Sequence, residues 1–198
     1  MPVTFPRSFP TVNGSSIIEK MTIRQVNAVA VQQSPYTYQQ QIQDFGGQRW
    51  EAEVTIRPLA HAEALAFQGF LASLQGQKNT FKLGNPIATS DNASNDVRLS
   101  TAHDAGDSTL AVTINSLHSV SAGQFFSISD RLYMFLEDAS SGNTTLDITP
   151  PLRQDAANST NCVTNLPQGT WRLASNKIDW DISKAGLYSF TFACVEAL

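Results

Sequence analysis

One strand in the first half of the chain constrains the fold more than any other segment. Over residues 50–57 the side chains alternate strictly between the apolar Trp50, Ala52, Val54 and Ile56 and the polar Glu51, Glu53, Thr55 and Arg57. Because successive side chains of a strand point to opposite faces, this alternation is typical of a strand with one buried and one solvated face. The chain must therefore build a sheet and cover one side of it.

The period changes directly after this strand, and the change predicts a helix over about 60–75. We expect Pro58 to end the strand, and apolar residues then recur every three or four positions, at Ala60, Ala64, Phe67, Leu71 and Leu74. Such a stripe is the buried face of a helix, and Gly76 stands where a left-handed C-terminal cap is wanted. We expect the stripe to cover the apolar face of the strand.

Other alternating segments predict further strands, over 21–31, 36–43, 79–83, 170–173, 178–182 and 187–195. Gln32–Pro35 interrupts the first two segments and indicates a hairpin, and Phe45–Gly47 indicates a turn before the strand at 50–57. The segments near the C-terminus are expected to join the sheet of the N-terminal part.

The composition changes at residue 87, which indicates an inserted domain. Residues 87–167 carry a net charge of −6, against +2 before them and 0 after them. This part contains short candidate strands and no candidate helix, at 97–100, 109–114, 124–129, 132–137 and 145–148. The sequence therefore predicts a mainly β (α+β) fold with one packed helix and a small inserted β-barrel or sandwich at 88–167.

Charge and composition exclude several classes of protein. The net charge of −4 and the pI near 5.3 lack the basic footprint of a nucleic-acid-binding domain. The sequence has no apolar run of about 20 residues, as a membrane span needs, and no secretory signal, so we expect a cytosolic site of synthesis and assembly. Two cysteines, Cys162 and Cys194, are too few for a disulfide framework, and we expect both to be reduced.

No catalytic template fits the sequence. The histidines His61, His103 and His118 lack the spacing of a zinc site, and the group of His103 with Asp107 reads as a solvated turn. The carboxylate pairs at 51 and 53 and at 179 and 181 could act as a glycosidase pair, but each also fits the solvated side of a half-buried strand. We expect no enzymatic activity, no cofactor and no metal ion.

Seven segments with glycine turns and aromatic anchors carry a resemblance to a known family. They are residues 45–54 (FGGQRWEAEV), 67–76 (FQGFLASLQG), 80–86 (TFKLGNP), 106–110 (GDSTL), 122–128 (AGQFFSI), 149–153 (TPPLR) and 169–173 (GTWRL). From about Met21 onward, the chain resembles the distal tail proteins of long-tailed (siphovirus-type) bacteriophages and gene-transfer-agent-like particles.

The resemblance implies a structural protein of the virion, located at the tail tip and assembled in the host cytoplasm. It implies a ring, commonly a homohexamer, that joins the tail tube to the hub or baseplate and lets DNA pass through its lumen without specific binding. It also implies a tail-tube-like β-sandwich or split barrel formed by residues 21–87 and 168–198, with residues 88–167 at the periphery. The implied partners are copies of the chain, the tube protein and the hub protein, with no membrane.

A channel for a polyanion should be lined by acidic or neutral polar groups. Two alternating polar sets are the candidates for lumen-facing residues: Gln39, Gln41, Gln43, Glu51, Glu53 and Thr55. The candidate core anchors are Trp50, Val54, Phe67, Leu71, Phe81, Trp180, Phe190 and Phe192. The proline-rich residues 1–20 cannot form a central strand, and we expect an extended arm that lies across a neighbour.

Other functions stay open at the level of the sequence. A carbohydrate-binding module of a tail tip would use the inserted domain, with Tyr133 and Phe135 as exposed aromatic platforms beside acidic residues. The chain could also be another tail tube, terminator or hub-associated protein. A small hydrolase built on Glu51 and Glu53 is a third alternative.

Overall fold

The computed structural model describes residues 4–85, 96–182 and 186–198. The elements are β1 (Arg7–Ser8), β2 (Thr11–Val12), β3 (Ser15–Ser16), β4 (Ile18–Gln33), β5 (Gln40–Leu59), α1 (His61–Leu74), β6 (Phe81–Gly84), β7 (Val97–Leu99), β8 (Thr109–Ile114), β9 (Phe125–Ile128), β10 (Arg131–Phe135), β11 (Gly142–Thr149), β12 (Gln168–Leu173), β13 (Trp180–Ile182) and β14 (Tyr188–Glu196). With fourteen strands and one helix in the described ranges, the chain is mainly β, as predicted.

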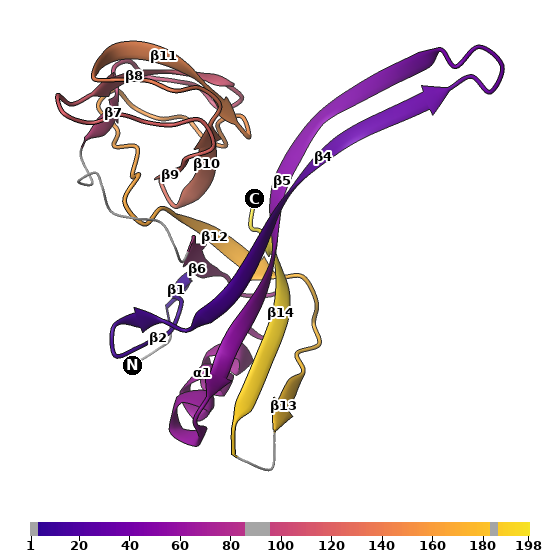
Figure 1. Cartoon of the computed structure of the whole chain (residues 1–198), viewed down its shortest axis with the longest axis vertical. Coiled ribbons are helices and arrows are strands. Elements are labelled where there is room, and N and C mark those ends of the chain that lie inside the picture. The colour runs from indigo at the N-terminus through magenta and orange to yellow at the C-terminus, as the bar shows by residue number, and fades with distance from the viewer. Residues whose placement is uncertain (1–3, 86–95, 183–185) are drawn as a thin grey trace.

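The larger sheet joins both ends of the chain. Its strands lie in the order β1-β6-β12-β14-β5-β4, and β13 pairs with the first residues of β14, Tyr188 to Phe190. A second sheet of order β7-β8-β11-β10-β9 is built from the middle of the chain (Figure 1). The predicted domain boundary near residue 87 falls outside the described residues, so the division into domains stays a prediction.

Strand β5 corrects one sequence expectation. Phe45–Gly47 does not form a turn, because β5 runs unbroken from Gln40 to Leu59. The register of β4 against β5 shifts between Asn27 and Val29, which pair with Gln48 and Asp44 respectively. Gly46 adopts a φ of +69° in this irregular stretch, so the glycines serve a bulge within a long strand.

Helix α1 forms at the predicted place and covers the apolar face of the larger sheet. Its buried residues are Ala64, Phe67, Phe70, Leu71 and Leu74. Beyond the helix end, Gln75 is left-handed, and Gly76 follows with a φ of +66°. A side chain at Gly76 would also meet Asn176 at 2.6 Å, so this position needs glycine for space as well as for conformation.

Seven of the eight candidate core anchors lie in the core of the larger sheet: Trp50, Val54, Phe67, Leu71, Phe81, Phe190 and Phe192. Trp180 does not, and its side chain is 44% exposed. It lies on β13, a three-residue strand that pairs only with β14 among the described strands. This position at the rim leaves one side of the indole in solvent, although the alternation of the sequence matches that of a buried strand.

The described part of the N-terminal segment, residues 4–20, is not a free arm. Strand β1 pairs in parallel with β6, and Ile17 is fully buried. The ring of Phe9 lies 5.9 Å from that of Phe67 and 5.6 Å from that of Phe70, measured between centroids. The segment therefore packs onto its own molecule, because Phe9 and Ile17 complete the core beneath the sheet. Pro2 lies outside the described residues.

Candidate assembly surfaces

The outer face of the larger sheet, opposite helix α1, is polar. Alternate residues of β4 share this face, and the register sets Lys20 opposite Thr55, Thr22 opposite Glu53 and Arg24 opposite Glu51. On the other side of β5, Thr55 and Glu53 pair with Thr191 and Ala193 of β14. We call this surface the polar face. It contains three of the six residues predicted to line a lumen.

Arginine side chains on the polar face are paired with carboxylates. Arg24 Nη2 lies 3.0 Å from Glu53 Oε2, and Arg49 Nη2 lies 2.6 Å from Glu51 Oε1. A third arginine, Arg57, forms an ion pair of 3.2 Å with Glu63 of the helix. The face therefore presents paired charges, with Lys20 as one further cation, where the sequence alone suggested an acidic strand flanked by arginines. Such a surface has little net attraction for a polyanion.

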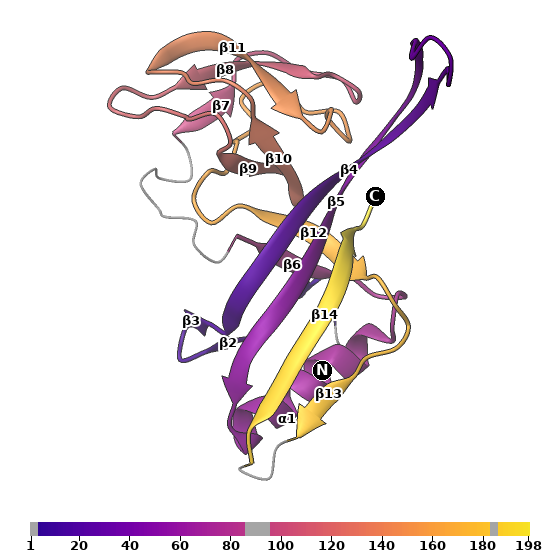
Figure 2. The same cartoon turned by 45° about the vertical axis from the view of Figure 1, so that its right-hand side comes forward.

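A two-stranded arm extends the sheet beyond the rest of the molecule. It comprises residues 27–48, the ends of β4 and β5 with the turn between them, and it projects away from helix α1 in both views (Figures 1 and 2). Gln41 and Gln43 pair with Gln32 and Ala30, which share the phase of Lys20, Thr22 and Arg24 along β4. These glutamines therefore continue the polar face along the arm. Gln39 precedes β5 and lies in the turn.

The opposite side of the arm carries exposed apolar residues, beside Asp44, which is the cross-strand partner of Val29. Val29 and Val31 lie on this side, and Ile42 is the cross-strand partner of Val31. Their exposed fractions are 46%, 58% and 64%. A two-stranded ribbon with both faces in water is marginal by itself. We call this surface the apolar arm face. It was not among the sequence predictions, and its signal in the sequence is the pair of valines two positions apart, Val29 and Val31.

Strand β4 leaves one long edge open. Among the strands of the described ranges it pairs only with β5. Proteins usually protect such an edge with charges or prolines. The charged residues of β4, Glu19, Lys20 and Arg24, all lie in its first half, and none occurs from Gln25 to Gln33. The second half of the edge is therefore suited to pairing with another chain.

The inserted sheet does not expose its aromatic residues. Tyr133 and Phe135 are fully buried, and the ring of Phe135 stacks on that of Phe126 with centroids 4.0 Å apart. Burial raises the pKa of the Tyr133 phenol, with opposing contributions from Arg153. Tyr133 and Phe135 cannot form the predicted carbohydrate platform, because both side chains point into the core of the inserted sheet.

The histidine and cysteine candidates occupy structural positions. His103 Nδ1 lies 2.9 Å from Asp107 Oδ2, and the amide of Ala111 donates to His103 Nε2 at 3.0 Å, which ties down a loop. Cys162 and Cys194 are free and buried, and burial raises the pKa of each to about 12. No group of three or more potential metal ligands occurs in the part of the chain that the structure describes.

A buried polar junction joins the inserted sheet to the larger one. Arg153 Nη2 lies 3.1 Å from Glu196 Oε2, and it also donates to the carbonyl of Gln48. Glu196 Oε2 accepts from the amide of Trp50 at 3.1 Å. The Trp50 indole in turn donates to the carbonyl of Leu132 at 3.0 Å. In β14 every second residue is buried: Phe190, Phe192, Cys194 and then Glu196. This spacing is a signal in the sequence that could have identified Glu196 as a buried carboxylate.

The comparisons with known proteins leave the family open. A scan against protein-family models finds no match for this chain, and a search of curated proteins finds none either. Within the described ranges, no helix has the length and apolar composition that crossing a membrane requires.

Proposed function

We propose that this chain is a structural subunit that assembles with copies of itself into a ring, at the distal end of the tail of a long-tailed bacteriophage or a related particle. The arm carries this proposal. It extends a sheet past its own core and exposes valine and isoleucine on one face. It also leaves the edge of β4 without a partner strand in the described chain. A ring of copies pairs such edges and leaves none open.

The polar face supports a role around a passing polyanion. Glu51, Glu53 and Thr55 lie on one continuous face with Gln41 and Gln43, and the arginines beside them are neutralised by ion pairs. If this face lines the lumen of the ring, DNA meets hydroxyl, amide and paired charged groups and is not retained. The tube and hub proteins would then bind the two rims of the ring.

The rival functions have less support. The carbohydrate-binding alternative rested on Tyr133 and Phe135, which are buried. The hydrolase alternative rested on Glu51 and Glu53, whose carboxylates are engaged by arginines on an open sheet face. A tail tube or terminator protein would share the same ring-forming surfaces and is the nearest alternative.

Shortening the arm tests the proposal. Residues 28–47 are replaced by Asn-Gly, so that a two-residue turn joins Asn27 to Gln48, which already pair in the sheet. Sedimentation velocity should find the complete chain as a closed oligomer, a whole multiple of 21.6 kDa, and the shortened chain as a monomer. The shortened chain should still unfold in one cooperative transition and keep a β-type circular dichroism spectrum, because the arm lies outside the core.

A matched control removes exposed apolar surface elsewhere. Leu117 is 97% exposed on the inserted part, and Leu117→Ser should leave the oligomer intact. A complete chain that stays monomeric at all concentrations, with or without purified tube and hub proteins, would contradict the proposed function.

A further inference from the structure

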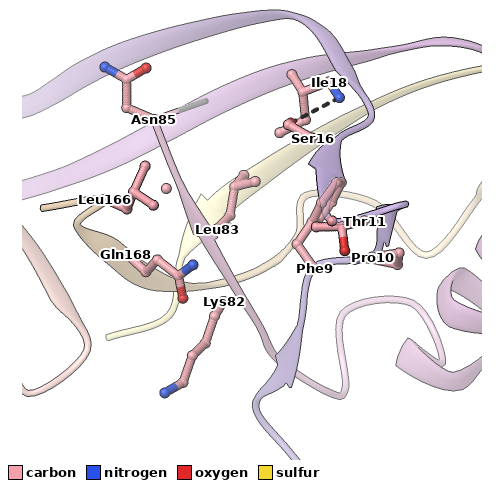
Figure 3. A pocket seen from close by; sticks show the side chains of 12 residues that line it. Phe9, Pro10, Thr11, Ser16, Ile18, Lys82, Leu83, Asn85, Leu166 and Gln168 are labelled. Atoms are coloured by element: carbon pink, nitrogen blue, oxygen red, sulfur yellow. Dashed lines mark hydrogen bonds between the residues drawn. The ribbon is translucent and has the colours of Figure 1, made fainter. Parts of the chain in front are cut away.

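A shallow trough runs beside the first half of β4. Two adjoining hollows of about 300 and 440 Å³ share Ser16, Ile18 and Asn85. Figure 3 shows Ile18 and Ser16 on one side of the first hollow, with Leu83, Asn85 and Leu166 on the other. The apolar residues that line the trough are Phe9, Ile18, Met21, Ile23, Leu83 and Leu166.

Backbone edges border this trough on both sides. Strand β1 pairs with β6 only at Phe81 and Lys82, so no described strand continues along that side of β6 at Leu83 and Gly84. Across the trough, the stretch Ile18–Ile23 of β4 has β5 on its other side only. The trough therefore offers apolar side chains and main-chain hydrogen-bonding groups together, the combination that an added extended segment uses.

We propose that the arm of a second copy of this chain lies in the trough, with its apolar face against the trough residues. The inference rests on the proposed function, because it names the two surfaces through which neighbouring subunits join. The proposed contact is heterologous, because the arm of one subunit binds the trough of the next. Such head-to-tail contacts close into a ring when the rotation between subunits allows it.

The lengths of the two surfaces match. At about 3.3 Å per residue, the arm part of β4 from Asn27 to Gln33 spans about 20 Å, and the trough stretch Ile18–Ile23 spans about 17 Å. The arm cannot fold back into its own trough, because both belong to the continuous strand β4. Val31 and Met21 are separated by about 33 Å of extended chain, so their contact must be between copies.

Their chemistry also matches. Val29, Val31 and Ile42 present branched apolar side chains, and the hollow beside β4 offers Ile18, Met21 and Ile23 among its polar lining residues. The arm has one charged residue, Asp44, and the trough contains Lys20, for which no carboxylate lies within ion-pair distance among the described residues. Glu19 also lines the trough. A register that places Asp44 near Lys20 is favoured by opposite charge, whereas a register that places Asp44 near Glu19 is disfavoured by like charge.

Cysteine crosslinking between two differently substituted copies tests the inference. Val31→Cys on one copy and Met21→Cys on the other are mixed, assembled and oxidised, and the disulfide-linked dimer is measured on a non-reducing gel. The native cysteines are buried and should not interfere. The control exchanges Val31→Cys for Gln32→Cys, on the opposite side of the same arm. The test pair should crosslink at least about tenfold faster than the control, because a disulfide needs close and facing Cβ atoms.

The outcomes separate this inference from the proposed function. Oligomers that form but crosslink the two pairs equally would overturn the arm-in-trough contact and leave the ring intact, with the arm covered by another surface such as a tube or hub protein. Absence of any oligomer would overturn both. Should a cysteine variant fail to assemble, Ile42→Cys with Ile23→Cys gives a second pair on the same two surfaces, and equal crosslinking of that pair and its control would again overturn the contact.

Discussion

Replacing Glu196 by glutamine should destabilise the molecule far more than the same change at the surface. The Glu196 side chain is 2% exposed and its partner Arg153 is 17% exposed. Glu196→Gln keeps the shape and one acceptor for the amide of Trp50 but removes the negative charge. The Arg153 guanidinium then stays largely buried at the junction of the two sheets with two neutral acceptors, the carbonyl of Gln48 and the amide oxygen at position 196, and no negative charge to balance it.

The structure sets the size of the effect. Removing one partner of a buried, hydrogen-bonded ion pair costs about 3 kcal/mol or more, because the remaining charge stays desolvated. For a chain of this length that loss lowers the melting temperature by about 6–12 °C. Glu53→Gln is the matched control: its ion pair with Arg24 has nearly the same length, 3.0 against 3.1 Å, but side chains that are 48% and 55% exposed. Its cost should stay below about 1 kcal/mol.

Urea unfolding followed by circular dichroism and tryptophan fluorescence measures both free energies of unfolding. Arg153→Met should also destabilise, and the double variant with Glu196→Gln should lose less than the sum of the two single losses, because the two residues interact. If Glu196→Gln and Glu53→Gln reduce stability equally, or if the double variant is simply additive, the junction does not hold the two sheets together as argued.

Three further predictions concern the core. Phe67→Ala should cost about 3–5 kcal/mol in urea unfolding, since the ring is buried among other phenylalanines, whereas Trp180→Ala should cost much less; equal losses would contradict the burial argued for each. Cys162 and Cys194 should resist thiol reagents at pH 8 until the chain unfolds, and rapid labelling of the folded chain would contradict this. The free energy of unfolding should also fall as the pH rises from about 9 towards 12, because the folded state holds thiol protons that the unfolded state releases. Gly84→Ala should lower the melting temperature measured by calorimetry, because its Cβ would lie 2.2 Å from a backbone carbonyl oxygen; an unchanged value would refute the close approach.

Most of the fold could be predicted from the local periodicity of apolar residues in the sequence. The helix and the strand at 50–57 were predictable because each pattern reflects which side chains meet water within one element. The role of Gly46 and Gly47 was not, since a glycine pair has the same local preferences in a turn and in a bulge. Only pairing with β4, which brings in residues about 20 positions away, decides between the two.

The candidate surfaces were predictable only in part. The shared face of Glu51, Glu53 and Thr55 follows from a period of two, and the structure adds their arginine partners. Trp180 has the alternation of a core residue, but its burial depends on where the sheet ends, which no local pattern encodes. The exposure of the apolar arm face was unpredictable for a related reason. Valines at 29 and 31 predict buried side chains, but no other described part of the same molecule covers them.

Electron microscopy of the purified chain shows whether its copies form a ring. Class averages should contain a closed ring around a central hole, in which the polar face of Glu53 and Thr55 lines the opening and every arm contacts the adjacent subunit. A population of separate particles of one chain each, with arms projecting freely at concentrations where tail proteins assemble, would contradict it.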